Sequence, residues 1–151
     1  MGLDMYLNRK KKYSADREEV GYWRKANQVH AWFVNNVQNG VDECQESTVT
    51  RKQLEELLSI CKKIKTESKI VSGVITNGYS YKDGKKIENN EIGNVIFNPE
   101  IADKLLPTQG GFFFGGTDYD EYYIMDIDNT IEILTAALNY KDDEFIYCAS
   151  W

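Results

Sequence analysis

The sequence is poor in the residue types on which common catalytic and metal-binding motifs depend. It contains one histidine, His30, and neither a G-x-S-x-G element nor a cysteine-protease pattern accompanies it. Its three cysteines are widely spaced and form no CxxC pair, which argues against a zinc site and a disulfide framework. The glycines at 110, 111, 115 and 116 fit neither a Walker loop nor a Rossmann fingerprint. We therefore expect no cofactor and favour a protein that is not an enzyme, with a small enzyme lacking a recognisable motif as an alternative.

The sequence also lacks a long apolar run. No stretch approaches the length of a membrane span, and the first residues lack the apolar core of a secretory signal. Gly2 follows Met1, but Tyr6 stands where a myristoylation signal requires Ser or Thr. Free thiols are typical of a reducing compartment. We therefore expect a cytoplasmic protein that does not contact a membrane.

Lysine and arginine are fewer than aspartate and glutamate, 18 against 24, so the net charge is -6 at pH 7. This balance argues against non-specific binding to nucleic acid or to an anionic membrane. Acidic residues gather between Asp118 and Asp128, but Tyr122 stands where an EF-hand needs an oxygen ligand. We therefore predict no metal site, and most of these charges are expected to lie on a solvated surface.

The apolar patterns predict a single α+β domain over residues 1–151, with a small, mostly antiparallel sheet packed with three to four helices. The first and last strands are expected to be neighbours in this sheet. The expected strands cover 2–7, 43–48, 70–75 and 144–151; a hairpin covers 79–87, a polar mobile segment 88–94, and helices 16–38, 51–65, 98–106 and 120–139. The segment 8–13 reads as a basic turn. The last helical segment is either one helix or two, with Asp128 capping the second.

The helix over 51–65 has the clearest signals. Thr50 and Gln53 form a capping-box pattern, and Val49 and Leu54 have the spacing of a hydrophobic staple. One apolar stripe follows the helix and consists of Leu54, Leu57, Leu58, Cys61 and Ile64. We expect this helix to be structural.

The stretch EVGYWRKANQVHAWFV, residues 19–34, carries the main functional hypothesis. In the expected helix, Trp23, Asn27 and His30 follow one another on successive turns beside the core face. Trp23 could then stack on an aromatic ring of a ligand, while Asn27 and His30 could form hydrogen bonds with the edge of that ring. Arg24 or Lys25 could meet a phosphate. A packing role explains Trp23 and His30 almost as well.

The stretch LPTQGGFFFGGTDYDEYY, residues 106–123, is the second unusual segment. Its phenylalanines stand between two Gly-Gly pairs. They form either a short buried strand between turns, or a loop whose glycines let the backbone approach a ligand. In the second case Thr117 and Tyr119 would add hydroxyl contacts.

Several of these segments together resemble a family of small proteins of phages and prophages. They are MGLDMYL, GYWRKANQVHAWFV, LPTQGGFFFGGTDYDEYY, DNTIEIL and the closing ASW. The resemblance extends over nearly the whole chain and is weakest over residues 68–98. Some relatives carry a phosphoglycerate-kinase label, which we discount because the chain has no phosphate loop and is too short for a two-domain kinase. The resemblance implies a phage accessory protein in a bacterial host cytoplasm. The resemblance does not identify any catalytic residues in this sequence.

Small phage accessory proteins often act by binding. We therefore expect a protein that binds a small anionic ligand with an aromatic ring, such as a nucleotide signal of host defence. The candidate ligand-binding residues are Trp23, Arg24, Lys25, Asn27, His30, Thr117 and Tyr119. The alternative is an inhibitor that binds a host protein through an acidic, tyrosine-rich surface.

Overall fold

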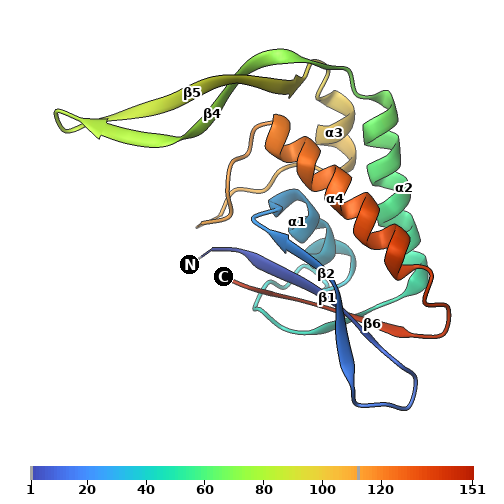
Figure 1. The fold of residues 1–151 in the computed structure, drawn as a ribbon. Coiled ribbons are helices and arrows are strands. Elements are labelled where there is room, and N and C mark those ends of the chain that lie inside the picture. Colours follow the sequence, from blue (N-terminus) through green and yellow to red (C-terminus); the bar gives the residue numbers. More distant parts are fainter. Residues whose placement is uncertain (1, 112) are drawn as a thin grey trace.

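The computed structural model describes residues 2–111 and 113–151 and has an α+β fold (Figure 1). In chain order its elements are β1 (Asp4–Lys10), β2 (Arg17–Arg24), α1 (Asn27–Asn36), β3 (Ser47–Val49), α2 (Arg51–Glu67), β4 (Ile70–Lys82), β5 (Lys85–Ile96), α3 (Glu100–Leu105), α4 (Glu121–Ala137) and β6 (Glu144–Ser150). Four strands form one antiparallel sheet, whereas β4 and β5 form a separate ribbon. The expected combination of antiparallel strands and helices is therefore confirmed.

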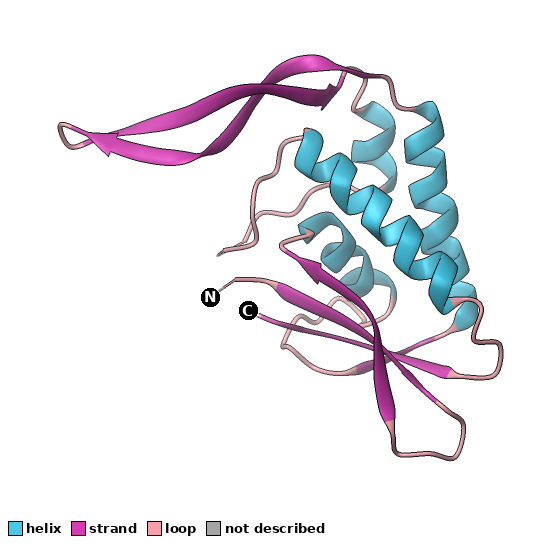
Figure 2. Cartoon of the chain, viewed as in Figure 1, coloured by secondary structure: helices cyan, strands magenta, loops and turns pink. Residues whose placement is uncertain are grey.

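The four-stranded sheet has the order β2-β1-β6-β3. The first and last strands are neighbours, as expected, and Leu7 lies opposite Tyr147. Helix α1 is fixed to the sheet by Phe33, whose ring stacks on that of Tyr147 with 3.9 Å between centroids. Helix α4 packs against both α2 and β2. The core thus lies between the sheet and the helices (Figure 2).

Helix α2 has the features that its sequence predicts. The Thr50 side chain accepts a hydrogen bond from the Gln53 backbone, and the Gln53 side chain accepts one from the Thr50 backbone. Of the apolar stripe, Leu54, Leu57, Cys61 and Ile64 are buried. Leu58 is only partly buried at the edge of the core. The helix is therefore structural.

The expectation of a helix over 16–38 is wrong in its first half, because Arg17–Arg24 is strand β2. Burial alternates there: Gly21 and Trp23 are buried, whereas Tyr22 and Arg24 are exposed. A Cβ atom on Gly21 would lie 2.4 Å from Cγ2 of Ile133, so this glycine lets β2 approach α4 closely. Pairing with β1 outweighs the local helix signals, and the helix begins only at Asn27.

Other boundaries also differ from the expected ones. The supposed basic turn is partly strand, since β1 extends to Lys10, and the short third strand is 47–49. The hairpin about Asp83-Gly84 is confirmed but extends over 70–96, so the polar segment 88–94 is ordered strand. Helix α3 begins at Glu100 and not at 98, and it has no side-chain cap; the Asn98 side chain accepts a hydrogen bond from the Lys69 backbone.

The segment 120–137 is one helix, with Asp120 as its N-cap and Asp128 within it. Asp120 Oδ1 accepts hydrogen bonds from the backbone N–H groups of Tyr122 and Tyr123. Before this helix, residues 113–119 form a loop and not a strand. Phe112, the first of the three phenylalanines, lies outside the described residues.

Candidate functional site

A cleft of about 650 Å³ lies where four distant parts of the chain meet. We call it the main cleft. Its walls are the end of β2, the middle of the β4–β5 ribbon, the loop 108–118 and the first turns of α4. The residues that line it include Arg24, Lys25, Thr76, Asn77, Gly78, Tyr79, Thr108, Gly115, Gly116, Asp118, Asp120, Tyr122, Tyr123, Met125 and Asp126. This size is within the range of pockets that hold small organic ligands.

Lys25 lines the main cleft and has an unusual backbone conformation. Its φ angle is +56°, in the left-handed region, and its N–H donates to the Leu3 carbonyl at 2.7 Å. Residues held in this region cost conformational energy and are frequent at functional sites. The loop touches Lys25 closely, since a Cβ atom on Gly115 would lie 3.1 Å from the Lys25 Cβ. With its φ of +90°, position 115 favours glycine for both reasons.

Arg24 precedes Lys25 and brings a second cation to the cleft. Its Nη1 donates to Asp4 Oδ1 at 2.9 Å, and the Tyr22 hydroxyl donates to the same oxygen. The Tyr22 and Arg24 hydrogen bonds lower the pKa of Asp4 below its ordinary value of 3.8. Asp4 therefore stays ionised at neutral pH and holds the guanidinium at the cleft rim.

The ribbon contributes an irregular part of β4 to the lining of the main cleft. The register between β4 and β5 shifts between Thr76 and Tyr79, so Asn77 and Gly78 form a β-bulge. Bulges redirect side chains and are common beside functional sites. Here the bulge brings Tyr79 to the cleft, with the Lys86 ammonium 3.8 Å from its ring centroid.

Helix α4 and its N-cap supply two carboxyl groups, Asp120 and Asp126, and burial disfavours the charged form of both. Burial raises the pKa of Asp120, although two backbone N–H groups oppose this effect. Burial also raises the pKa of Asp126 to about 7, against a smaller opposing effect of the Gln28 hydrogen bond. Asp126 therefore binds a proton more readily than an exposed aspartate does. The cleft is thus less negative than its carboxylates imply.

Aromatic and thioether groups on α4 give the cleft an apolar part. Tyr122 and Met125 are exposed. Tyr123 is buried instead, and its hydroxyl donates to the Leu106 carbonyl at 2.8 Å. The main cleft therefore combines cations, carboxylates, glycine backbone and ring faces, which is a suitable combination for a polar ring with a charged group.

Trp23 does not line the main cleft. It is 1% exposed, and its Nε1 donates to Thr130 Oγ1 at 2.9 Å. The expectation that Trp23, Asn27 and His30 share one helix face is wrong, because β2 ends at Arg24 before α1 begins. In this structure the Trp23 ring packs in the core and offers no face to a ligand.

Asn27 holds the glycine-containing loop in place. Its Nδ2 donates to the carbonyls of Phe114 and Gly116 at 3.1 and 2.8 Å, and its Oδ1 accepts from the Gln109 N–H at 2.9 Å. All three contacts join the start of α1 to a segment more than 80 residues away. Asn27 therefore positions a wall of the main cleft without lining it.

His30 is 1% exposed, and both of its ring nitrogens have partners. Nδ1 lies 2.6 Å from the Tyr147 hydroxyl, and Nε2 lies 2.9 Å from Asp42 Oδ2. Burial raises the pKa of Tyr147 well above its ordinary value, so this hydroxyl stays protonated at neutral pH. Both ring nitrogens of His30 are thus engaged with neighbouring side chains.

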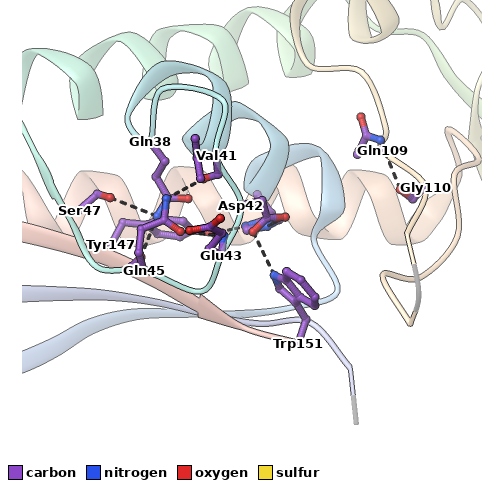
Figure 3. Close-up of polar contacts among 11 residues, drawn as sticks. Gln38, Val41, Asp42, Glu43, Gln45, Ser47, Gln109, Gly110, Tyr147 and Trp151 are labelled. Carbon is purple, nitrogen blue, oxygen red and sulfur yellow. Dashed lines mark hydrogen bonds and ion pairs between the residues drawn. The ribbon is translucent and has the colours of Figure 1, made fainter.

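The loop that carries Asp42 is itself ordered by hydrogen bonds (Figure 3). Gln38 is buried and donates to the Gln45 carbonyl at 2.9 Å, while Trp151 Nε1 donates to Asp42 Oδ1 at 3.0 Å. A smaller hollow of about 250 Å³ lies beside His30 and is also lined by Gln109. The network around His30 thus joins α1 to the loop that carries Asp42 and to β6, and His30 does not line the main cleft.

Thr117 and Tyr119 lie in the loop before α4 but are not among the residues that line the main cleft. The Thr117 carbonyl accepts a hydrogen bond from Thr108 Oγ1 at 2.9 Å. The Tyr119 hydroxyl donates to Asp103 Oδ1 at 2.6 Å. Of the seven expected residues, the structure thus brings two, Arg24 and Lys25, to the main cleft. Trp23, Asn27 and His30 are buried outside it, and Thr117 and Tyr119 do not line it.

The residues that the ribbon and α4 bring to this cleft were not among those expected from the sequence. Asn77-Gly78 was a visible signal, but such a pair also predicts a simple turn. Asp120 and Asp126 belong to the acidic segment, where nothing in the local pattern indicates which carboxylates face inward. Within 2–111 and 113–151, no cluster of His, Cys, Asp and Glu could hold a metal ion. None of the described helices has the length and apolarity needed to cross a membrane.

Comparison with known proteins found no matching family model, no matching curated protein and no matching solved structure.

Proposed function

We propose that this protein binds a small anionic ligand with an aromatic ring, of which a nucleotide is the best example, in the main cleft. One observation carries the proposal: Lys25, in a left-handed conformation, lines the cleft together with Arg24 and the Gly115-Gly116 backbone. Two cations and nearby glycine backbone are suited to a phosphate.

The remainder of the cleft suits the ring of such a ligand. Tyr79 and Tyr122 offer exposed aromatic surface on which a base can stack. The carboxylates of α4 accept hydrogen bonds, so they complement the N–H groups on the edge of a base. Asn27 contributes indirectly, because it holds the loop that forms one wall of the cleft.

The resemblance to phage and prophage proteins gives this binding a biological role. In the cytoplasm of an infected bacterium, the protein would sequester a nucleotide signal of host defence. Sequestration needs tight binding and no reaction, which agrees with a sequence that lacks a catalytic motif.

A thermal-shift assay with mononucleotides, dinucleotides and cyclic nucleotides tests the proposal. A ligand at one hundred times its dissociation constant adds about 2.7 kcal/mol of stability. For a chain of this size, that gain raises Tm by roughly 5–10 °C. Lys25→Asn should abolish most of the shift, because asparagine tolerates a left-handed backbone but carries no charge. Lys52→Asn, on the exposed side of α2, is the matched control.

The proposal fails if no nucleotide in the panel raises Tm. It also fails if Lys25→Asn retains the full shift, since this cation of the cleft would then have no part in binding.

A host protein remains the second candidate ligand, because Tyr122 and Met125 are exposed on the same acidic segment of α4. Large apolar side chains beside carboxylates are a common composition for protein interfaces. Recovery of a host protein that is lost in Tyr122→Ala, together with no nucleotide shift, would favour this candidate.

A further inference from the structure

The β4–β5 ribbon projects from the rest of the molecule as an arm (Figures 1 and 2). Only its base is anchored: Ile75 is buried, and Val95 forms an isolated bridge with Asp120 at the start of α4. Towards the tip, residues 77–92 have no third strand and are largely exposed. An isolated two-stranded ribbon is only marginally stable in water, so a surface that covers this arm would stabilise it.

One face of the arm carries most of its large exposed side chains. Val74 lies opposite Ile92, and these side chains are 70% and 82% exposed. Tyr81 lies opposite Lys86 and is 74% exposed. The bulge adds one residue to β4, and this places Tyr81 on the same face as Val74 instead of the opposite one. We call this surface the arm face; it consists of Val74, Tyr79, Tyr81, Lys86, Glu88 and Ile92.

Charge indicates which partner fits the arm face. The arm, residues 70–96, carries three lysines and three acidic residues, so the whole net charge of -6 belongs to the remainder of the chain. Two copies of an acidic protein repel each other over most of their surfaces. The arm is therefore the segment through which two copies approach with least repulsion. The arm face itself carries one cation, Lys86, and one anion, Glu88.

We propose that the protein forms a symmetric dimer in which the arm face packs against the same face of a second copy. A two-fold axis brings one patch onto itself, so Lys86 of each copy can pair with Glu88 of the other. Val74 and Ile92 lie at the base end of the arm face, and their apolar area is removed from water in this contact. Tyr79 belongs to the arm face and also lines the main cleft, so the second arm would lie at the cleft rim.

Sedimentation equilibrium of the full chain tests this proposal. We expect a reversible monomer–dimer equilibrium between roughly 1 and 300 µM protein. Ile92→Lys should raise the dimer dissociation constant at least tenfold, or about 1.4 kcal/mol, because it places a charge in the apolar contact. Ile92→Thr keeps a β-branched residue in the strand and should weaken the dimer without disturbing the ribbon. Val41→Lys, at an exposed apolar position outside the arm, should leave the equilibrium unchanged.

A wild-type chain that stays monomeric over this range overturns the proposal, and the arm face must then serve a different partner. A dimer that persists with unchanged affinity in both Ile92 variants also overturns it, because the contact would then lie elsewhere. The ligand-binding proposal is unaffected by either result, since it rests on Lys25 and the main cleft.

Discussion

Gln28 Nε2 donates a hydrogen bond to Asp126 Oδ2 at 3.2 Å and so joins helix α1 to helix α4 at the wall of the main cleft. Asp126 is half-buried there, and burial raises its pKa to about 7. The hydrogen bond from Gln28 opposes this shift but is the smaller effect. A carboxyl group that titrates near neutrality is thus built into the candidate site.

Asp126 should make the stability of the protein depend on pH. In the unfolded chain its carboxyl has a pKa near 3.8, so between pH 3.8 and about 7 the folded state holds a proton that the unfolded state has released. The free energy of unfolding therefore contains a contribution that is present below pH 3.8 and is lost as pH rises through 7. Asp126→Asn removes this contribution, because the amide is neutral throughout.

Urea unfolding at pH 5 and pH 8 measures this effect, and wild type should lose about 1–2 kcal/mol more than Asp126→Asn, given the partial exposure of the group. Asp128→Asn, on the exposed side of the same helix, is the control and should behave as wild type. Equal pH dependence in wild type and Asp126→Asn would show that the carboxyl is solvated.

Asn27→Ala should loosen the loop that forms one wall of the main cleft. The substitution removes the acceptor of the Gln109 N–H and the donor to two loop carbonyls. Local opening then becomes easier, and amide hydrogen exchange at Gln109 should accelerate at least about tenfold. Asn35→Ala, on the exposed side of α1, is the matched control. Unchanged exchange at Gln109 in Asn27→Ala would mean that other contacts hold the loop.

Neighbouring leucines on α2 should differ in their contribution to stability. Leu57 is fully buried, so Leu57→Ala should cost about 2–5 kcal/mol. Leu58 lies at the edge of the core, so Leu58→Ala should cost less, about 1 kcal/mol. Equilibrium unfolding of both variants gives the comparison. Equal losses would place Leu58 in the core as firmly as Leu57.

The fold was predictable where the local signals agreed with the tertiary contacts. Helix α2 has its cap, staple and apolar stripe within one segment, so its sequence was sufficient. The helix predicted over 17–24 was wrong because Asp16 and Glu19 have the spacing of a helix N-terminus. Pairing with β1 makes this segment a strand instead. The alternation of Gly21 and Trp23 with Tyr22 was present in the sequence, but over too few residues to outweigh the helical period.

Of the residues that line the main cleft, only the cations Arg24 and Lys25 were predicted from the sequence. Arg24 and Lys25 were identifiable because they form a local reversal of charge in an acidic chain. The other walls come from the bulge at Asn77-Gly78 and from α4, which lie about 50 and 100 residues farther along. Contacts over such separations depend on the tertiary arrangement of the arm and helix, which no local pattern encodes.

Nuclear magnetic resonance with a nucleotide titration tests binding in the main cleft most directly. AMP, GMP and cyclic AMP are added in turn to the isotopically labelled full chain, and backbone amide shifts are recorded for wild type and Lys25→Asn. Binding as proposed should shift the amides of Lys25, Gly78, Gly115 and Gly116, which come from three segments lining the cleft. The shifts should be lost in Lys25→Asn. Amides that stay in place with every nucleotide, or that move only at the arm tip or beside His30, would contradict binding in this cleft.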